Sequence, residues 1–330
     1  LATADLGLLS IDARNYGVRR VGVAEGLSSN ELTDVISLSD NAFAVATEGV
    51  YGSKGVDLVR SHRGSALIGL NYVDLSSLTS ESPLTMVNVG KDALFVFRKG
   101  LIYYDLKRRV LESVSGAPES IVGACGSKFV DGQAWLLVTV SGKNIVKEVV
   151  RDARGKFAFK DLPSTLAVNP EKIFHDGTSL WCVDHAQSGV FLYTGATWEL
   201  RAGSPDVAKA NGGVAAADSL AVSRRSSPAI SDALWMVKSG KVFVRSIPHD
   251  ALQAELPWPW KEVTVLEKDH LGEVHAFSID DVGYLIVPYP DKILLLSHRE
   301  SSGYGKSLLQ LPKTDSRIRS IDVGSNDVAI

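Results

Sequence analysis

The chain ends with "RIRSIDVGSNDVAI" (317–330), and this stretch decides how the fold is interpreted. Residues 317–323 have the pattern of a strand, 324–326 are typical of a turn, and 327–330 begin a second strand. A hairpin alone is only marginally stable in water, and its open edge is a template for aggregation. The sheet must therefore be completed by strands from elsewhere in the chain.

A pattern of short strands recurs along the whole sequence. In "LTDVISLSDNAFAVATEGVYG" (32–52) a strand, a tight turn, a second strand and a polar link follow one another. Such segments are rich in Val, Ile, Phe, Tyr and Trp, and no long period of 3.6 residues competes, so they indicate strands rather than helices. Similar segments occupy 86–106, 121–150, 172–195, 229–246, 274–298 and 318–330.

The first turn of each segment measures the repeat. The steps between these turns are 51, 40, 45, 55, 51 and 43 residues, which suits a four-stranded propeller blade. The step from the last turn through the chain end to the first is 45 residues. We therefore predict an all-β, seven-bladed β-propeller with four-stranded antiparallel blades, closed by N- and C-terminal strands that share one blade. The turns are at Asn41, Asp92, Gly132, Gly177, Asp232, Gly283 and Asn326.

This closure predicts a single β-propeller domain over 1-330. Hydrophobic residues make up 45% and charged residues 22% of the 330 residues, which is enough to form a core. The predicted blades are 27-68, 84-116, 119-163, 170-204, 216-266, 272-313, and 316-330 with 1-25.

Composition also restricts the partners. The net charge is −3, and the densest basic clusters are only 107–109 and 224–225, so we predict no nucleic acid partner. No run of eighteen apolar residues occurs, so we predict no membrane insertion. Cys125 and Cys182 fit no zinc or redox spacing and are predicted to be buried in strands. Whether they have a redox role stays open.

The segment "GLSSNELTDVISLSDNAFAVATEGVYG" (26–52) resembles the two-component regulator propeller repeat. Phe43 stands where that family commonly has Trp. The resemblance implies an extracytoplasmic sensing domain, periplasmic or secreted, and a cytoplasmic location remains an alternative. The positions that carry it are Gly26, Leu27, Ser28, Ser29, Asn30, Asp40, Asn41, Thr47, Gly49 and Tyr51.

No catalytic motif accompanies the repeats. "SSGYGKS" (301–307) lacks the first Gly of a phosphate-binding loop and is predicted to be a turn between strands. The seven His form no local ligand pair, and neither a calcium loop nor a nucleophile elbow occurs. We therefore predict no catalytic residue, no metal site and no cofactor. "GATWEL" (195–200) matches half of a sialidase Asp-box, which keeps a carbohydrate-active enzyme open.

The Trp residues divide into two groups. Trp135, Trp181 and Trp235 lie in second strands among apolar residues, so we predict that they pack between blades. Trp258 and Trp260 lie in "PWPW" (257–260), where Pro prevents regular strand pairing. They cap the core or form a binding surface.

The links between second and third strands are the predicted site, because loops on a rigid scaffold vary without disturbing it. We expect a non-catalytic module that binds a protein, a polar small molecule or a carbohydrate there. The alternatives are a propeller enzyme acting on carbohydrate, as a glycosidase or lyase, and a cytoplasmic scaffold of a larger assembly. The predicted binding residues are Glu48, Arg98, Lys99, Asp184, His185, Lys238, Tyr289 and Asp291.

Overall fold

The structure is a computed structural model, and it consists of β-strands apart from one 3-10 turn, η1 (Val23–Glu25), in the part described. It describes residues 2–3, 6–11, 18–39, 42–48, 54–60, 68–75, 78–79, 81, 83–126, 133–152, 154–164, 166–175, 179–184, 189–202, 219–223, 232–247, 260–270, 274–279, 282–299, 303–311 and 318–320.

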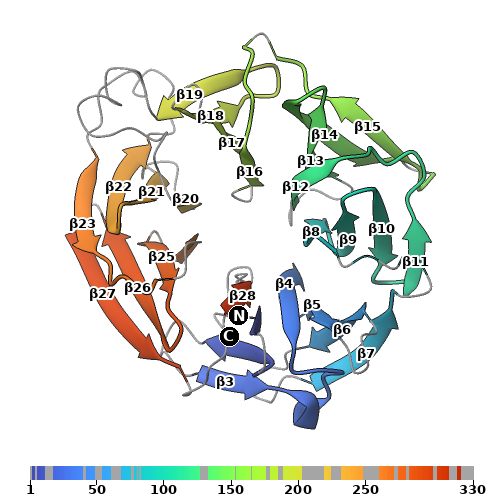
Figure 1. Ribbon diagram of the computed structural model, residues 1–330, viewed down its shortest axis with the longest axis horizontal. Coiled ribbons are helices and arrows are strands. Elements are labelled where there is room, and N and C mark those ends of the chain that lie inside the picture. The colour runs from blue at the N-terminus through green and yellow to red at the C-terminus, as the bar shows by residue number, and fades with distance from the viewer. Residues whose placement is uncertain are drawn as a thin grey trace. The chain divides into compact units, whose positions relative to one another are not determined.

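The strands form seven four-stranded sheets in which neighbouring strands run antiparallel, the architecture of a seven-bladed β-propeller (Figure 1). This confirms the predicted fold class. Blades 1 to 6 are numbered along the chain, and the blade that contains strands from both chain ends is blade 7.

Blades 1 to 3 each use four consecutive strands. Blade 1 contains β4 (Leu32–Ser39), β5 (Ala42–Glu48), β6 (Lys54–Arg60) and β7 (Ile68–Asp74). Blade 2 contains β8 (Thr85–Val89), β9 (Asp92–Phe97), β10 (Gly100–Asp105) and β11 (Val110–Ser113). Blade 3 contains β12 (Ile121–Gly126), β13 (Gln133–Val140), β14 (Lys143–Arg151) and β15 (Phe157–Asp161).

Blades 4 to 6 repeat this order. Blade 4 contains β16 (Lys172–His175), β17 (Leu180–Asp184), β18 (Gly189–Tyr193) and β19 (Trp198–Ala202). Blade 5 contains β20 (Ser219–Ser223), β21 (Asp232–Lys238), β22 (Lys241–Ile247) and β23 (Lys261–Val265). Blade 6 contains β24 (His275–Ile279), β25 (Val282–Pro288), β26 (Lys292–Arg299) and β27 (Gly303–Gln310).

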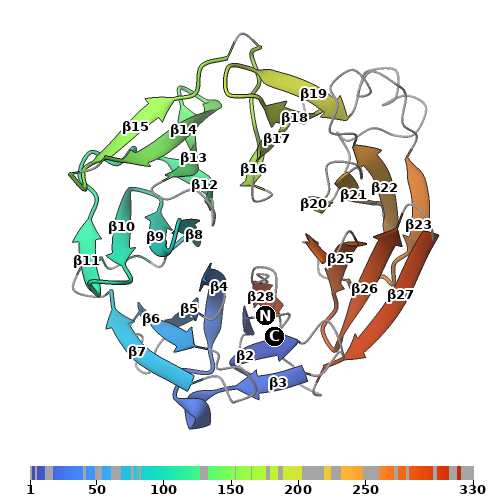
Figure 2. The ribbon, with the colours of Figure 1, turned by 180° about the vertical axis from the view of Figure 1, so that it is seen from behind.

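Blade 7 combines both ends of the chain, as predicted. Its order is β28 (Ile318–Ser320), β1 (Ala2–Thr3), β2 (Leu8–Ile11) and β3 (Val18–Val21), and Ala2 pairs with both Ser320 and Leu8. Figure 2 shows β2 and β28 close together in this blade. The strand beside β28 thus comes from the N-terminus, whereas the expected strand at 327–330 lies outside the described residues.

By its internal contacts the chain divides into two compact units. Unit 1 comprises residues 1–182, 195–197 and 316–330, and unit 2 comprises 183–194 and 198–315. Within unit 1, the first strands β4, β8 and β12 lie side by side, and β7, β11 and β15 form the opposite edges of their sheets (Figure 1). A single domain over the whole chain stays a prediction.

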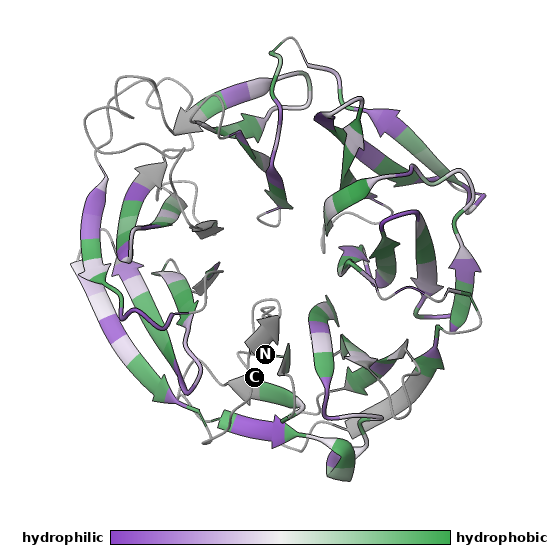
Figure 3. Ribbon diagram, in the orientation of Figure 1, coloured by the Kyte–Doolittle hydropathy of each residue, from purple (hydrophilic) through white to green (hydrophobic). Residues whose placement is uncertain are grey.

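The middle strands are apolar on both faces because neighbouring blades cover both. On β9, Phe95 and Phe97 pack in a cluster with blade 1, whereas Leu94 and Val96 pack in a cluster with blade 3. Successive side chains of a strand point to opposite faces, so alternate residues meet different blades. The outer strand β11 is mostly exposed, and Figure 3 shows hydrophilic residues on β11 and β15.

The strand bounds also test details of the sequence predictions. Six predicted blade ranges contain every described strand of their blade, but 27-68 stops where β7 begins. The prediction of a turn at 301–307 is wrong for 303–307, which belong to β27. There Gly303 adopts a φ of 83°, a left-handed conformation that glycine accepts without strain.

Candidate functional site

The structure places the predicted site residues in or beside the links between second and third strands. Arg98 and Lys99 form the β9–β10 turn, and Asp184 and Lys238 end β17 and β21. Glu48 ends β5, and its backbone pairs with Lys54. Tyr289 and Asp291 lie between β25 and β26, whereas His185 lies outside the described residues. Their role in binding stays a prediction.

These residues differ sharply in exposure. Arg98, Lys99 and Asp291 are exposed, and Lys238 is partly buried. Asp184 and Tyr289 are 0% and 2% exposed, so their side chains form part of the interior. In unit 1 the link residues Arg98 and Lys99 are therefore accessible, and in unit 2 Lys238 and Asp291 are accessible, whereas the side chains of Asp184 and Tyr289 are not.

Tyr289 fastens the segment that connects blades 5 and 6. The Glu267 backbone N–H donates to the Tyr289 hydroxyl at 3.3 Å, and the Lys292 ammonium donates to Glu267 Oε2 at 2.5 Å. The same ammonium lies 5.1 Å from the centroid of the Tyr289 ring. Burial raises the pKa of Tyr289, and the Glu267 carboxylate raises the pKa of Lys292. The hydroxyl thus serves as a neutral structural partner.

The segments that leave the fourth strands are fixed to the same links. In blade 5, Leu266 N–H donates to the Gly240 carbonyl at 2.7 Å, and in blade 6, Leu311 N–H donates to the Asp291 carbonyl at 2.9 Å. Both Leu side chains are nearly buried. The second-to-third links therefore lie on the side of each blade where the chain crosses to the next one, and backbone hydrogen bonds hold them in place.

Several Asp carboxylates of unit 1 accept hydrogen bonds from backbone N–H groups. Each of five Asp side chains accepts at least one backbone N–H bond at 2.8 to 2.9 Å, which satisfies an otherwise unpaired donor. The pairs are Asp34 with Met86, Asp57 with Ser28, Asp92 with Leu106, Asp105 with Arg108, and Asp152 with Arg154 and Lys156.

Two residues of the 26–52 motif meet at a buried carboxylate. The Ser28 hydroxyl donates to Asp57 Oδ2 at 2.7 Å and lies 3.2 Å from the Thr47 hydroxyl. Asp57 is 2% exposed; burial raises its pKa, and the hydrogen bonds from Ser28 oppose this only in part. The sequence analysis missed Asp57, because no local pattern links it to Ser28, 29 positions earlier.

The described residues form no metal site and no membrane-spanning helix. Among them, no three His, Cys, Asp or Glu side chains are grouped so that they could hold a metal ion. Cys125 and Cys182 are free thiols that lie in strands, as predicted, but only Cys182 is buried, whereas Cys125 is partly exposed. The packing around the Cys125 sulfur nevertheless removes it from water and raises its pKa. No helix in the described part is long and apolar enough to cross a membrane.

Comparisons with known proteins support the fold. A candidate 6-phosphogluconolactonase from Bacteroides uniformis aligns over 94% of this chain and 98% of its own, with a TM-score of 0.54 and 11% identity. The structure of U3-55K aligns over 89% of this chain and 85% of its own, with a TM-score of 0.55 and 10% identity. A GH74 enzyme from Niastella koreensis aligns over 87% of this chain and 42% of its own, with a TM-score of 0.51 and 12% identity.

At such low sequence identities, structural similarity supports a shared fold but not a shared activity. No protein-family model matches the chain, and a search of curated proteins finds no match. The propeller part of the sequence prediction is thus confirmed, whereas the resemblance of 26–52 to the two-component regulator repeat has no support from a family model.

Proposed function

We propose that this propeller is a non-catalytic binding module that recognises a protein or a polar ligand through its second-to-third links. The observation that supports this proposal is that Asp carboxylates of unit 1 bind backbone N–H groups, while basic side chains of a link are exposed. Asp34, Asp57 and Asp92 hold backbone N–H groups of other strands or links, whereas Arg98 and Lys99 extend into solvent from a short turn. Such a surface can select partners by charge placement without chemistry.

The sensing role and the extracytoplasmic location belong to this proposal. Their support is the resemblance of residues 26–52, in which Ser28 and Thr47 meet at Asp57. This arrangement stabilises blade 1, and in the described part of the chain its hydrogen bonds reach none of the exposed link residues Arg98, Lys99 and Asp291. A sensing module of this kind would offer the links as its recognition surface.

The test compares binding with turnover. The protein is incubated with a panel of neutral and acidic oligosaccharides, and binding, release of reducing sugar and hydrolysis of 6-phosphogluconolactone are measured. We expect binding without turnover. Arg98→Glu combined with Lys99→Glu should weaken this binding about tenfold, a loss of about 1.4 kcal/mol, while the melting temperature changes little.

The matched control is Lys261→Glu combined with Lys306→Glu, which reverses the charge of two exposed residues on outer strands of unit 2. This pair should bind like the natural sequence. Repeated turnover of the lactone or of any oligosaccharide, abolished by a single substitution, would establish the enzyme alternative instead. Equal binding by the Arg98 and Lys99 variant would place the partner elsewhere.

A further inference from the structure

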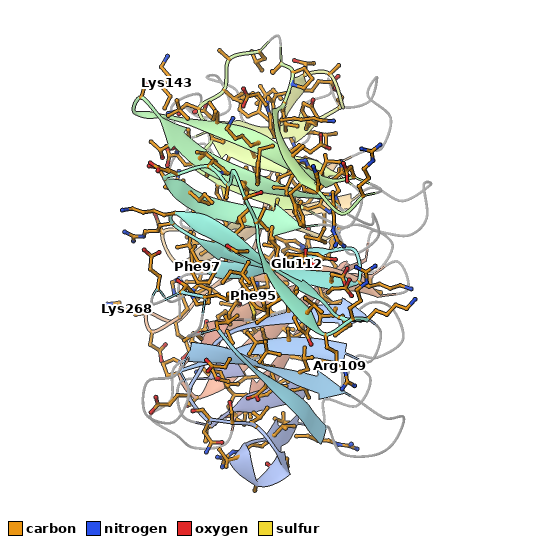
Figure 4. The ribbon with its side chains drawn as sticks, turned by 90° about the vertical axis from the view of Figure 1, so that its right-hand side faces the viewer. Phe95, Phe97, Arg109, Glu112, Lys143 and Lys268 are labelled. Atoms are coloured by element: carbon orange, nitrogen blue, oxygen red, sulfur yellow. The ribbon has the colours of Figure 1, made fainter. Side chains whose placement is uncertain are left out.

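Two neighbouring blades of unit 1 carry basic turns between their third and fourth strands. Lys107, Arg108 and Arg109 join β10 to β11, and Arg154 and Lys156 belong to the turn between β14 and β15. We call these five exposed residues the basic turn pair. They lie at the opposite ends of their strands from the second-to-third links, as Lys143 and Arg109 illustrate in Figure 4.

An Asp side chain fixes each turn from within. Asp105 Oδ1 accepts the Arg108 N–H at 2.8 Å, and Asp152 Oδ1 accepts the N–H groups of Arg154 and Lys156 at 2.8 and 2.9 Å. The carboxylates are thereby directed at the backbone. Hydrogen bonds from an Asp side chain to backbone a few residues ahead hold a turn in one conformation, so the cationic side chains project from fixed positions.

Most of the positive charge in the basic turn pair is unpaired. Arg108 forms a long ion pair, with Nε 3.8 Å from Asp105 Oδ2. Within the described part of the chain, the side chains of Lys107, Arg154 and Lys156 have no hydrogen-bond or ion-pair partner. The turns therefore present five cations against two carboxylates, although the whole chain has a net charge of −3.

Arg151 ties the two turns together. Its Nη1 donates to the Tyr103 hydroxyl at 2.6 Å, its guanidinium carbon lies 4.2 Å from the Tyr103 ring centroid, and its Nε donates to the Gly155 carbonyl at 3.3 Å. Tyr103 in turn donates to Asp92, whose other oxygen accepts the Leu106 N–H at 2.9 Å. One side chain thus spans from β10 of blade 2 to the turn of blade 3.

This connection brings the charges within reach of one ligand. Tyr103 and Asp105 are two residues apart on β10, which is about 7 Å along a strand. Gly155 belongs to the turn of Arg154 itself. Arg151 therefore links the start of one turn to the backbone of the other, and their positive fields add most strongly at low ionic strength, where screening is weak.

We propose that the basic turn pair binds an acidic polypeptide segment in an extended conformation. The neighbouring strand explains why the partner is a peptide. In blade 2 the order is β11-β10-β9-β8, so β11 is an edge strand, and Val110 beside the turn is 42% exposed. An added strand gains main-chain hydrogen bonds along such an edge, and its acidic side chains reach the adjacent cations.

Other anions fit this surface less well. Binding of a single nucleic acid strand relies on aromatic side chains that stack on bases. Among the residues of unit 1 whose side chains are described, no Phe, Tyr or Trp is exposed. A free phosphate would meet only part of a charge that is divided between two turns. An extended acidic peptide can contact the cations of the basic turn pair, the exposed Val110 side chain and the edge of β11 at the same time.

The test uses a fluorescent peptide of alternating Glu and Val, with binding to the full chain followed by anisotropy. Lys107→Glu combined with Lys156→Glu should weaken binding about tenfold or more, because neither side chain has a structural partner among the described residues. Lys261→Glu combined with Lys306→Glu is the matched control and should bind normally. Raising salt to about 0.15 M should weaken binding. A peptide with alternate N-methyl groups, which blocks strand pairing, should also bind more weakly.

Several outcomes would overturn this inference. Equal affinity of the Lys107 and Lys156 variant would show that the turns are not the site. Unchanged affinity of the N-methylated peptide would reject strand addition. Full displacement by inorganic phosphate, or tighter binding of single-stranded DNA or heparin through the same two lysines, would assign the surface to another anion. The proposed function is unaffected by these results, since it rests on Arg98 and Lys99 at the other ends of the strands.

Discussion

At the scale of single residues, the raised pKa of the buried Asp57 predicts how the free energy of unfolding depends on pH. Its folded-state pKa lies above the ordinary 3.8, because burial outweighs the hydrogen bonds from Ser28. The folded protein therefore holds this proton more tightly than the unfolded chain. The resulting stabilisation is complete below pH 3.8 and is lost as the pH rises through the folded pKa. Asp57→Asn cannot ionise, so the free energy of unfolding of the variant should rise relative to the natural protein across this window.

Urea unfolding of both proteins between about pH 3 and about pH 7 measures this difference. Asp291→Asn makes the same chemical change at an exposed position and serves as the control. A constant difference between Asp57→Asn and the natural protein at every pH would contradict the assignment. The Ser28 N–H can still donate to the amide oxygen that the substitution introduces, so a loss of this bond does not obscure the trend.

The predicted burial of Trp135, Trp181 and Trp235 is confirmed, since they are 6%, 2% and 0% exposed. Trp235 lies in the cluster between blades 5 and 6 and meets His298 edge-on, with ring centroids 6.2 Å apart. Trp235→Ala should lower the free energy of unfolding by about 3–5 kcal/mol, because it leaves a cavity. Val265→Ala, at a side chain that is 61% exposed, should change it by less than about 0.5 kcal/mol. Similar losses at both positions would refute the interpretation.

At the scale of elements, Gly126 sets how closely the first strands β8 and β12 approach. A Cβ at this position would overlap the backbone of Asn88, whereas a Cβ at Gly100 would meet nothing within 4 Å. Gly126→Ala should therefore cost about 1–3 kcal/mol of stability, since one strand must move. Gly100→Ala should be close to neutral. Thermal unfolding of the two variants decides this, and equal melting temperatures would show that β8 and β12 adjust without cost.

The strands could be predicted because their signal is local, whereas their polar partners could not. The run of apolar residues along β9 and the turn that follows it are visible in a few consecutive residues. The bond from Met86 to Asp34 joins positions 52 apart, and the one from Glu267 to Tyr289 joins positions 22 apart. Neither spacing is a period of strand or turn geometry. The burial of Tyr289 therefore has no signal in the sequence, while the exposure of Arg98 follows from its place in a short turn.

At the scale of the whole molecule, the repeat length predicted the blade that both chain ends share. It could not predict which end supplies each strand, because β1 contains only two residues and has no detectable pattern. Pairing of Ala2 with Ser320 and of Thr3 with Ile318 gives this short strand most of its support. The stability of the N-terminal strands therefore depends on the C-terminal segment.

Deleting residues 317–330 tests this dependence. The deletion removes β28, which pairs with β1 and also contacts β4 of blade 1. β1 would keep a single paired position, Ala2 with Leu8, and would become an open edge. We expect the truncated chain to aggregate or to lose its cooperative unfolding transition, as followed by circular dichroism and light scattering. A synthetic peptide of residues 317–330 should restore the transition, and a scrambled peptide should not. A truncated chain with an unchanged free energy of unfolding would mean that blade 7 does not need its C-terminal strand, and the argument from closure to a single domain would fail with it.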